Sequence, residues 1–308
     1  MIVGSRGSAL ALKQTGLMVE RLKSLRPGLE IEVRVIKTTG DKILHEPLTR
    51  IAGRGFFVAE IERALLRGQI DFAVHSMKDL PTEMTPGLCI AAIPEREDPS
   101  DALISRGPGL RDLPAGARIG TSSPRRRAQL LHFRPDLQIV DVRGNLDTRL
   151  RKLDEGLFDA IVLAYAGLHR MGWADRITER IPPEICLPAV GQGALAIQAR
   201  EDDREVNDLL AGLDHAESRI AVTAERAFMH ALGGGCQVPV GALGSIEGDK
   251  LVLNGVAAGL DGSTLVRGEV SGNPVEPSRL GDELAQVLLT AGAGEILDQV
   301  RTRMECEG

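Results

Sequence analysis

The chain has 308 residues, of which 43% are hydrophobic, and its formal net charge is −6. This length is too great for one compact core and predicts two or three domains, and the negative charge disfavours a general nucleic-acid-binding protein. The sequence has no apolar run long enough to cross a bilayer and no charged and then apolar leader at its start, so we expect a cytoplasmic protein without membrane contacts.

Predicted strands and helices alternate in the first third of the chain. Apolar runs and polar–apolar alternation indicate the strands, and Ser8 is a good N-cap for the first helix. The expected strands are 2–4, 30–35 and 70–74, and the expected helices follow Ser8 and span 58–67. Charged residues between two prolines then predict a linker at 94–99.

The same alternation restarts in the middle third. The expected elements are strands at 119–121, 138–142 and 160–163, a helix from Pro124, and a helix from Asn145 to Gly156. Alternating β and α elements predict largely parallel sheets with right-handed crossovers. A proline-rich stretch at 182–188 marks a second possible hinge.

The pattern changes from His215 onward. We expect a helix to about Met229, then a glycine-rich loop, strands at 251–260 and 265–270, and two further helices. The Asp-Gly pair between these strands is typical of a hairpin turn. The fold class is therefore expected to be α/β, with a distinct C-terminal α+β unit.

The glycine-rich loop presents a single cysteine. Three glycines precede Cys236, and Gln-Val-Pro follows it, so the loop leaves one sulfur open to approach. An ordinary loop thiol and a reactive thiol are both open interpretations of this loop by itself. The other cysteines, Cys89, Cys186 and Cys306, show no Cys-x-x-Cys spacing, which disfavours a disulfide framework and a zinc site, so we expect no metal.

Serine, threonine and arginine residues gather where predicted strands pass into helices. Hydroxyls and free N–H groups at a helix start bind anions, and arginine adds bidentate bonds to carboxylates. From residue 118 to 170 there are ten Lys and Arg against six Asp and Glu. A solvated basic face explains any one arginine, but the set favours a polycarboxylate site that contains Arg125, Arg126, Arg143 and Arg149.

Asp79 ends the segment His-Ser-Met-Lys-Asp, directly after a predicted strand. Pro81 breaks the loop that follows, so the aspartate could merely cap a turn. The functional interpretation is a reactive carboxylate next to the cation of Lys78.

Five segments in this order resemble the porphobilinogen deaminase family. They are His-Ser-Met-Lys-Asp at 75–79, Gly-Thr-Ser-Ser-Pro-Arg-Arg at 120–126, Arg-Gly-Asn at 143–145, Leu-Pro-Ala-Val-Gly-Gln-Gly at 187–193 and Gly-Gly-Cys-Gln-Val-Pro at 234–239. The resemblance implies two α/β domains similar to type II periplasmic binding proteins and a C-terminal α+β domain that carries the cofactor cysteine. The implied domains are 1–94 with 190–213, 95–189, and 214–308.

The resemblance also implies an enzyme, a transferase that makes hydroxymethylbilane for tetrapyrrole and haem biosynthesis. Such an enzyme deaminates four porphobilinogen molecules and joins them head to tail on a dipyrromethane primer, which Cys236 would carry as a thioether. Asp79 would stabilise the azafulvene cation left by loss of ammonia and would move protons. Each pyrrole ring carries two carboxylates, which explains a need for many cations.

By the same resemblance, binding roles pass to matching residues. Those implied for the cofactor are Cys236, Ser76, Lys78, Thr121, Ser123, Arg125, Arg126 and Arg143. Those implied for the substrate are Arg6, Ser8, Ser122, Arg149 and Arg170. One segment departs from the family pattern, because Arg54 keeps a positive charge there but Ala59 replaces a lysine, which puts a basic role at position 59 in doubt.

Two rival classes remain open at this point. An anion-binding protein of the periplasmic class would explain two lobes, hinges and arginines. It would not need an exposed cysteine on a third domain, and an exported version would need the export signal that this sequence lacks. An RNA-binding module is disfavoured by the negative net charge and because only one Trp, one Tyr and six Phe are available to stack on bases. We expect a monomer whose partner is porphobilinogen, with no nucleic acid.

Overall fold

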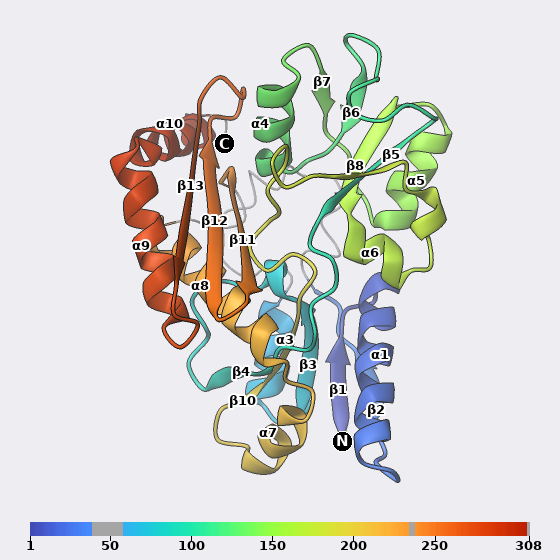
Figure 1. Ribbon diagram of the computed structural model, residues 1–308. Coiled ribbons are helices and arrows are strands. Elements are labelled where there is room, and N and C mark those ends of the chain that lie inside the picture. The colour runs from blue at the N-terminus through green and yellow to red at the C-terminus, as the bar shows by residue number, and fades with distance from the viewer. Residues whose placement is uncertain (39–57, 234–237, 307–308) are drawn as a thin grey trace.

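The computed structural model describes residues 1–38, 58–233 and 238–306, with side chains to residue 302. Within this part of the chain, the strands form two five-stranded sheets and one three-stranded sheet. Figure 1 shows the first sheet below, the second above it and the three-stranded sheet beside both. We call these units lobe 1, lobe 2 and the C-terminal domain.

Lobe 1 is built on a sheet with the strand order β2-β1-β3-β10-β4. Its strands are β1 (Ile2–Ser5), β2 (Glu32–Val35), β3 (Phe72–Ser76), β4 (Leu88–Ala92) and β10 (Leu195–Arg200), and its helices are α1 (Ala9–Leu25), α3 (Ala59–Leu66) and α7 (Arg204–Ala211). Ser8 caps α1 as expected, because its side chain accepts the N–H of Ala11 at 3.3 Å. Leu22, Phe72 and Ile197 are fully buried in the core between α1 and the sheet.

Lobe 2 repeats this arrangement in the order β7-β6-β8-β5-β9. Its strands are β5 (Asp101–Ser105), β6 (Arg118–Gly120), β7 (Gln138–Val140), β8 (Ala160–Ala164) and β9 (Glu179–Ile181), and its helices are α4 (Pro124–Phe133), α5 (Leu146–Asp154) and α6 (Tyr165–Arg170). Ser123 caps α4, with Pro124 in the first turn. Asn145 occupies the N-cap position of α5 without a capping side-chain hydrogen bond.

Both sheets contain antiparallel strands where largely parallel sheets were expected. In lobe 1, β10 runs antiparallel to β3 and β4, and in lobe 2, β5 runs antiparallel to β8 and β9. Each of these two strands begins directly after the chain has crossed from the other lobe. It therefore starts at the sheet edge that faces the other lobe, where β3 and β8 end, and it must run the opposite way.

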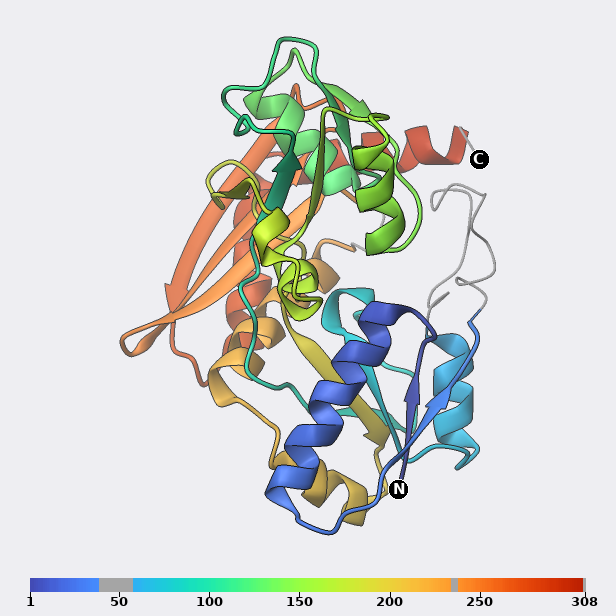
Figure 2. The ribbon, with the colours of Figure 1, turned by 90° about the vertical axis from the view of Figure 1, so that its right-hand side faces the viewer.

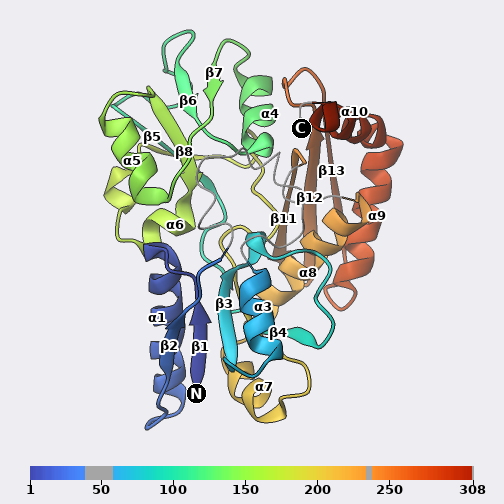
Figure 3. The ribbon, with the colours of Figure 1, turned by 180° about the vertical axis from the view of Figure 1, so that it is seen from behind.

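The C-terminal domain is an antiparallel meander covered by helices. Strands β11 (Val240–Glu247), β12 (Lys250–Ala258) and β13 (Leu265–Gly272) pack against α8 (Ala216–Ala231) and α9 (Pro277–Thr290), with α10 (Ala293–Cys306) at the end of the chain (Figure 3). A Cβ at Gly255 would lie 2.8 Å from both Phe228 and Leu284, so this glycine lets the two helices approach the sheet closely.

Two segments cross between the lobes. The expected linker at 94–99 is the first, whereas the second crossing follows the proline-rich 182–188 stretch, whose Cys186 is buried in the core of lobe 2. The crossings touch where Gly193, with φ of +86°, passes the backbone of Glu97 too closely for a Cβ. Two α/β units and a C-terminal α+β unit are confirmed, while the exact domain limits stay predictions.

Candidate functional site

A cavity of about 90 Å³ lies between lobe 1 and lobe 2. Figure 2 shows the two lobes meeting where α1 contacts α6, and the cavity is lined at this junction by both helices. Its polar lining consists of Gln14, Ser76 and Lys78 from lobe 1 and Arg126, Arg149 and Arg170 from lobe 2. No Asp or Glu occurs among the lining residues that the structure describes. The four cations therefore line a cavity to which no described carboxylate contributes.

Hydrogen bonds with two glutamines hold the side chains of Ser76 and Lys78 in the lobe 1 wall. Gln14 of α1 exchanges hydrogen bonds of 3.3 Å with Ser76 at the end of β3. Lys78, in the 3-10 turn η1 (Met77–Asp79), donates from Nζ to Oε1 of Gln192 at 3.3 Å. Burial, together with the nearby charge of Arg126, lowers the pKa of Lys78 to about 8. Its charged form therefore gains from any anion that enters the cavity.

Arg149 and Arg170 form the lobe 2 wall. Arg149 donates from Nε to the carbonyl of Gly144 at 2.8 Å, and Arg170 donates to the carbonyl of Gly193 at 2.6 Å. Burial lowers the pKa of Arg170, and burial with the charges of Arg126 and Arg143 lowers the pKa of Arg149 to about 10. Among the described residues, neither guanidinium has a carboxylate within ion-pair distance, which suits a carboxylate-bearing ligand.

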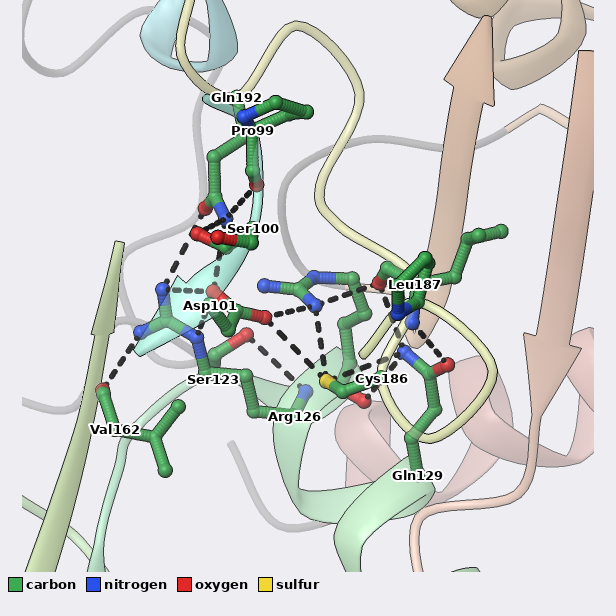
Figure 4. A network of polar contacts seen from close by, with 12 residues as sticks. Pro99, Ser100, Asp101, Ser123, Arg126, Gln129, Val162, Cys186, Leu187 and Gln192 are labelled. Atoms are coloured by element: carbon green, nitrogen blue, oxygen red, sulfur yellow. Dashed lines mark hydrogen bonds and ion pairs between the residues drawn. The ribbon is translucent and has the colours of Figure 1, made fainter. Parts of the chain in front are cut away.

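Behind this wall lies a buried network centred on Asp101 (Figure 4). The carboxylate of Asp101 accepts from Arg125 at 2.7 Å, from Arg126 at 2.7 and 2.9 Å, and from Gln192 at 2.8 Å. Burial alone would raise the pKa of this carboxyl, but the two guanidinium groups outweigh burial and hold the pKa far below its usual range. The network joins α4 and β5 of lobe 2 to the second crossing segment.

The network gives Arg125 and Arg126 different positions. Arg125 is 4% exposed, donates to Asp101 and to the carbonyl of Leu187 at 2.7 Å, and does not line the cavity. Arg126 binds Asp101 and the carbonyl of Val162 at 3.0 Å, and it does line the cavity. Arg125 thus lies behind the site, and Arg126 forms part of its surface.

Thr121, Ser122 and Ser123 build the loop between β6 and α4. Ser122 Oγ donates to the carbonyl of Val142 at 2.8 Å and accepts the N–H of Val142 at 3.1 Å, which ties this loop to the end of β7. Thr121 is buried and accepts the N–H of Ser123 at 3.3 Å. None of the three lines the cavity.

Four further predicted residues are not part of the cavity lining. Asp79 is half-buried in η1, close enough to Lys78 for its charge to favour the lysine cation. Arg143 is half-buried, and its carbonyl accepts from Lys152 at 3.1 Å. Arg6 and Ser8 lie at the loop between β1 and α1, where Nε of Arg6 is buried.

Cys236 and Arg54 lie outside the described residues, so their predicted roles are not placed by the structure. Ala59 is the first residue of α3. In the described ranges, no group of three His, Cys, Asp or Glu could hold a metal ion, and no helix is long and apolar enough to cross a membrane.

Sequence reasoning did not identify Gln14, Asp101 or Gln192. Asp101 could have been suspected, because a lone aspartate heads the apolar run Ala-Leu-Ile directly after a proline linker. Gln192 stands inside a motif that was recognised as a whole, without a role for its amide. Gln14 gives no sequence signal beyond its place on α1.

Comparisons with known proteins cover nearly the whole chain. Residues 1–208 match the family model "Porphobilinogen deaminase, dipyromethane cofactor binding domain", and residues 219–290 match "Porphobilinogen deaminase, C-terminal domain". The chain is 55% identical to porphobilinogen deaminase of Desulforudis audaxviator over 98% of both chains. It is 56% identical to porphobilinogen deaminase of Pelotomaculum thermopropionicum over 97% of this chain and 96% of that protein.

Among solved structures, the chain is similar to the periplasmic aliphatic sulphonate binding protein SsuA of Escherichia coli. The two are 13% identical, with a TM-score of 0.41, over 75% of this chain and 70% of that one. The family models and the two relatives agree with the ordered motifs of the sequence. The chain belongs to the porphobilinogen deaminase family.

Proposed function

We propose that the cavity between the lobes binds the carboxylates of dipyrromethane and porphobilinogen while hydroxymethylbilane is assembled. The observation that carries this proposal is the set of four cations around a cavity whose described lining contains no carboxylate. Partly buried cations are costly where no described carboxylate lines the cavity that they face, so a ligand that brings several carboxylates stabilises the site. Porphobilinogen brings two carboxylates with each ring.

The residues present fit the dipyrromethane cofactor of the family. Lys78, Arg126 and Arg149 would hold its carboxylates, since all three line the cavity. When bound, the cofactor supplies the primer on which pyrrole rings are added. Thr121 and Ser123 support the start of α4 from behind, and Arg125 fixes Asp101 so that Arg126 keeps its orientation.

Asp79 is proposed as the catalytic carboxylate. It follows Lys78, which lines the cavity, in the turn η1. A preorganised anion favours the positive charge that develops on the substrate as ammonia leaves, and the same carboxylate can take a proton from the pyrrole nitrogen. Arg6, Ser8, Ser122, Arg143 and Arg170 are proposed to bind cofactor or substrate around this point.

The proposed function is tested first by the intact mass of the purified protein. We expect a mass above that of the polypeptide by a two-pyrrole adduct, located on the peptide that contains Cys236. The physical reason is that a thiolate is a soft nucleophile suited to an electron-poor carbon. Active protein in which Cys236 is unmodified and freely alkylated would contradict the proposal.

A second prediction concerns Arg149→Leu. Burial and the charges of Arg126 and Arg143 lower the pKa of Arg149, so removal of its charge should leave the melting temperature unchanged or higher. Turnover or cofactor loading should fall by about tenfold or more, because a charge-assisted bond of about 1.5–3 kcal/mol to the ligand is lost. Arg151→Leu is the control, since this side chain is 69% exposed on the same helix. Equal turnover in both variants would refute the polycarboxylate site.

We propose a cytoplasmic monomer with domains 1–94 with 190–213, 95–189 and 214–308. One chain contributes both walls of the cavity, so no second copy is needed to complete it. Sedimentation of the active enzyme at assay concentration would reveal a dimer if this proposal is wrong.

A further inference from the structure

Helix α8 of the C-terminal domain reaches lobe 1 through the side chain of Arg226. The guanidinium donates to the carbonyl of Pro81 at 2.6 Å and to that of Thr82 at 3.1 Å. It also lies 3.8 Å from Sδ of Met77. These partners come before and after Asp79 in the chain, so one side chain spans the segment that carries the proposed catalytic carboxylate.

The chain after Asp79 needs such support. Pro81 has no N–H to donate, and residues 81–87 form neither helix nor strand. Before Asp79, by contrast, the N–H of Met77 donates to the carbonyl of Ala194 at 3.0 Å and ties η1 to the second crossing segment. Arg226 therefore satisfies two carbonyls at the point where the ordered turn gives way to irregular backbone.

Helix α8 is itself held in place by hydrogen bonds to the neighbouring residue Glu225. Glu225, next to Arg226, is fully buried and accepts from the guanidinium of Arg96 and from the N–H groups of Gly191 at 2.7 Å and Gly244 at 2.8 Å. These bonds attach α8 to both crossing segments and to the sheet of its own domain. The helix ends at Ala231, five positions before Cys236 in the sequence.

We infer that Arg226 is a positioning residue that fixes the Asp79 segment to the helix leading to Cys236. Its effect passes through the backbone carbonyls of Pro81 and Thr82. A displacement of about 1 Å at a reacting group costs on the order of 10²-fold in rate, so loss of this support should act on the chemical step. The inference rests on the proposed role of Asp79.

Arg219 offers a matched control on the same helix. Its guanidinium also donates to backbone carbonyls of lobe 1, those of Ile90 and Ala91 at 3.4 and 3.1 Å, but these belong to β4 and its sheet rather than to the Asp79 segment. Arg219→Met and Arg226→Met therefore both remove hydrogen bonds from α8 to backbone carbonyls of lobe 1, and Arg219→Met also removes an ion pair with Asp214. Only the second removes support from the segment next to Asp79.

The experiment compares these variants as purified holoenzyme, with kcat and KM for porphobilinogen, intact mass and thermal melts. Arg226→Met is expected to lose about 10- to 10²-fold in kcat with little change in KM, cofactor mass or fold. Arg219→Met should keep its kcat. Arg226→Lys should recover only part of the loss, because its ammonium offers one donor centre where the guanidinium offers a fork of two nitrogens.

Three results would overturn the inference: normal kcat in folded Arg226→Met, an equal loss of kcat in Arg219→Met, or loss of the cofactor adduct in Arg226→Met alone. If Arg226→Met fails to fold, Arg226→Lys against Arg219→Lys decides the question, and normal kcat in Arg226→Lys refutes it. Asp79→Asn distinguishes a failure of the proposed catalytic role of Asp79 from a failure of the positioning role of Arg226. Normal turnover there removes the proposed function of Asp79, whereas an inactive Asp79→Asn with an active Arg226→Met removes only the role of Arg226.

Discussion

Asp79→Asn should leave the protein folded and lower kcat by at least about 10²- to 10³-fold, the usual cost of losing one preorganised electrostatic interaction with a developing charge. Asparagine is nearly isosteric and can still form hydrogen bonds, so packing around the half-buried side chain should survive. If Asp79 also moves protons, a further factor of about 10²–10⁴ is expected. Steady-state kinetics with porphobilinogen and a thermal melt measure both quantities.

Asp79→Glu is the companion variant. It keeps the negative charge but moves it by one methylene, so its kcat should lie between those of the wild type and Asp79→Asn. Intact mass must show the same adduct in all three proteins, because a missing primer would lower kcat for another reason. A folded, fully loaded Asp79→Asn enzyme with near-normal kcat would remove Asp79 from the mechanism.

Asp101→Asn should cause the largest loss of stability, about 3–5 kcal/mol, the typical cost of removing one partner from a buried ion pair. The change leaves the guanidinium groups of Arg125 and Arg126, which are 4% and 6% exposed, without a buried anion. Turnover should fall as well, because Arg126 lines the cavity and takes its orientation from Asp101. Urea denaturation at neutral pH measures the free energy of unfolding.

The pH dependence of this effect follows from the depressed pKa of Asp101. A carboxyl whose pKa is lower in the folded state contributes fully above its unfolded pKa of about 3.9, and this contribution is lost as pH falls toward the folded value. The difference between wild type and Asp101→Asn should thus be constant from about pH 5 to 8 and shrink in acid. Asp154→Asn, which breaks an exposed pair with Arg176, should change stability little. Equal losses in both variants would contradict the buried-network interpretation.

Much of the local structure could be predicted from the sequence, because it depends on neighbouring residues. Ser8 and Ser123 cap the helices that follow them, and the Asp-Gly pair near residue 261 joins two antiparallel strands. The ordered motifs also indicated the family, which the comparisons confirm. The sequence analysis predicted none of the strands β4, β5, β9, β10 and β11, which alternation with helices does not reveal.

The arrangement of the site depended on contacts between distant parts of the chain. The sequence by itself determined the two α/β units, the α+β end and the arginine-rich loops, since periodicity, caps and turn residues act over a few positions. Only the tertiary structure decided that Arg125 faces Asp101 while Arg126 also lines the cavity, although the two are adjacent in the chain. Successive helical residues point in different directions, and what each one meets depends on which crossing segment packs against α4.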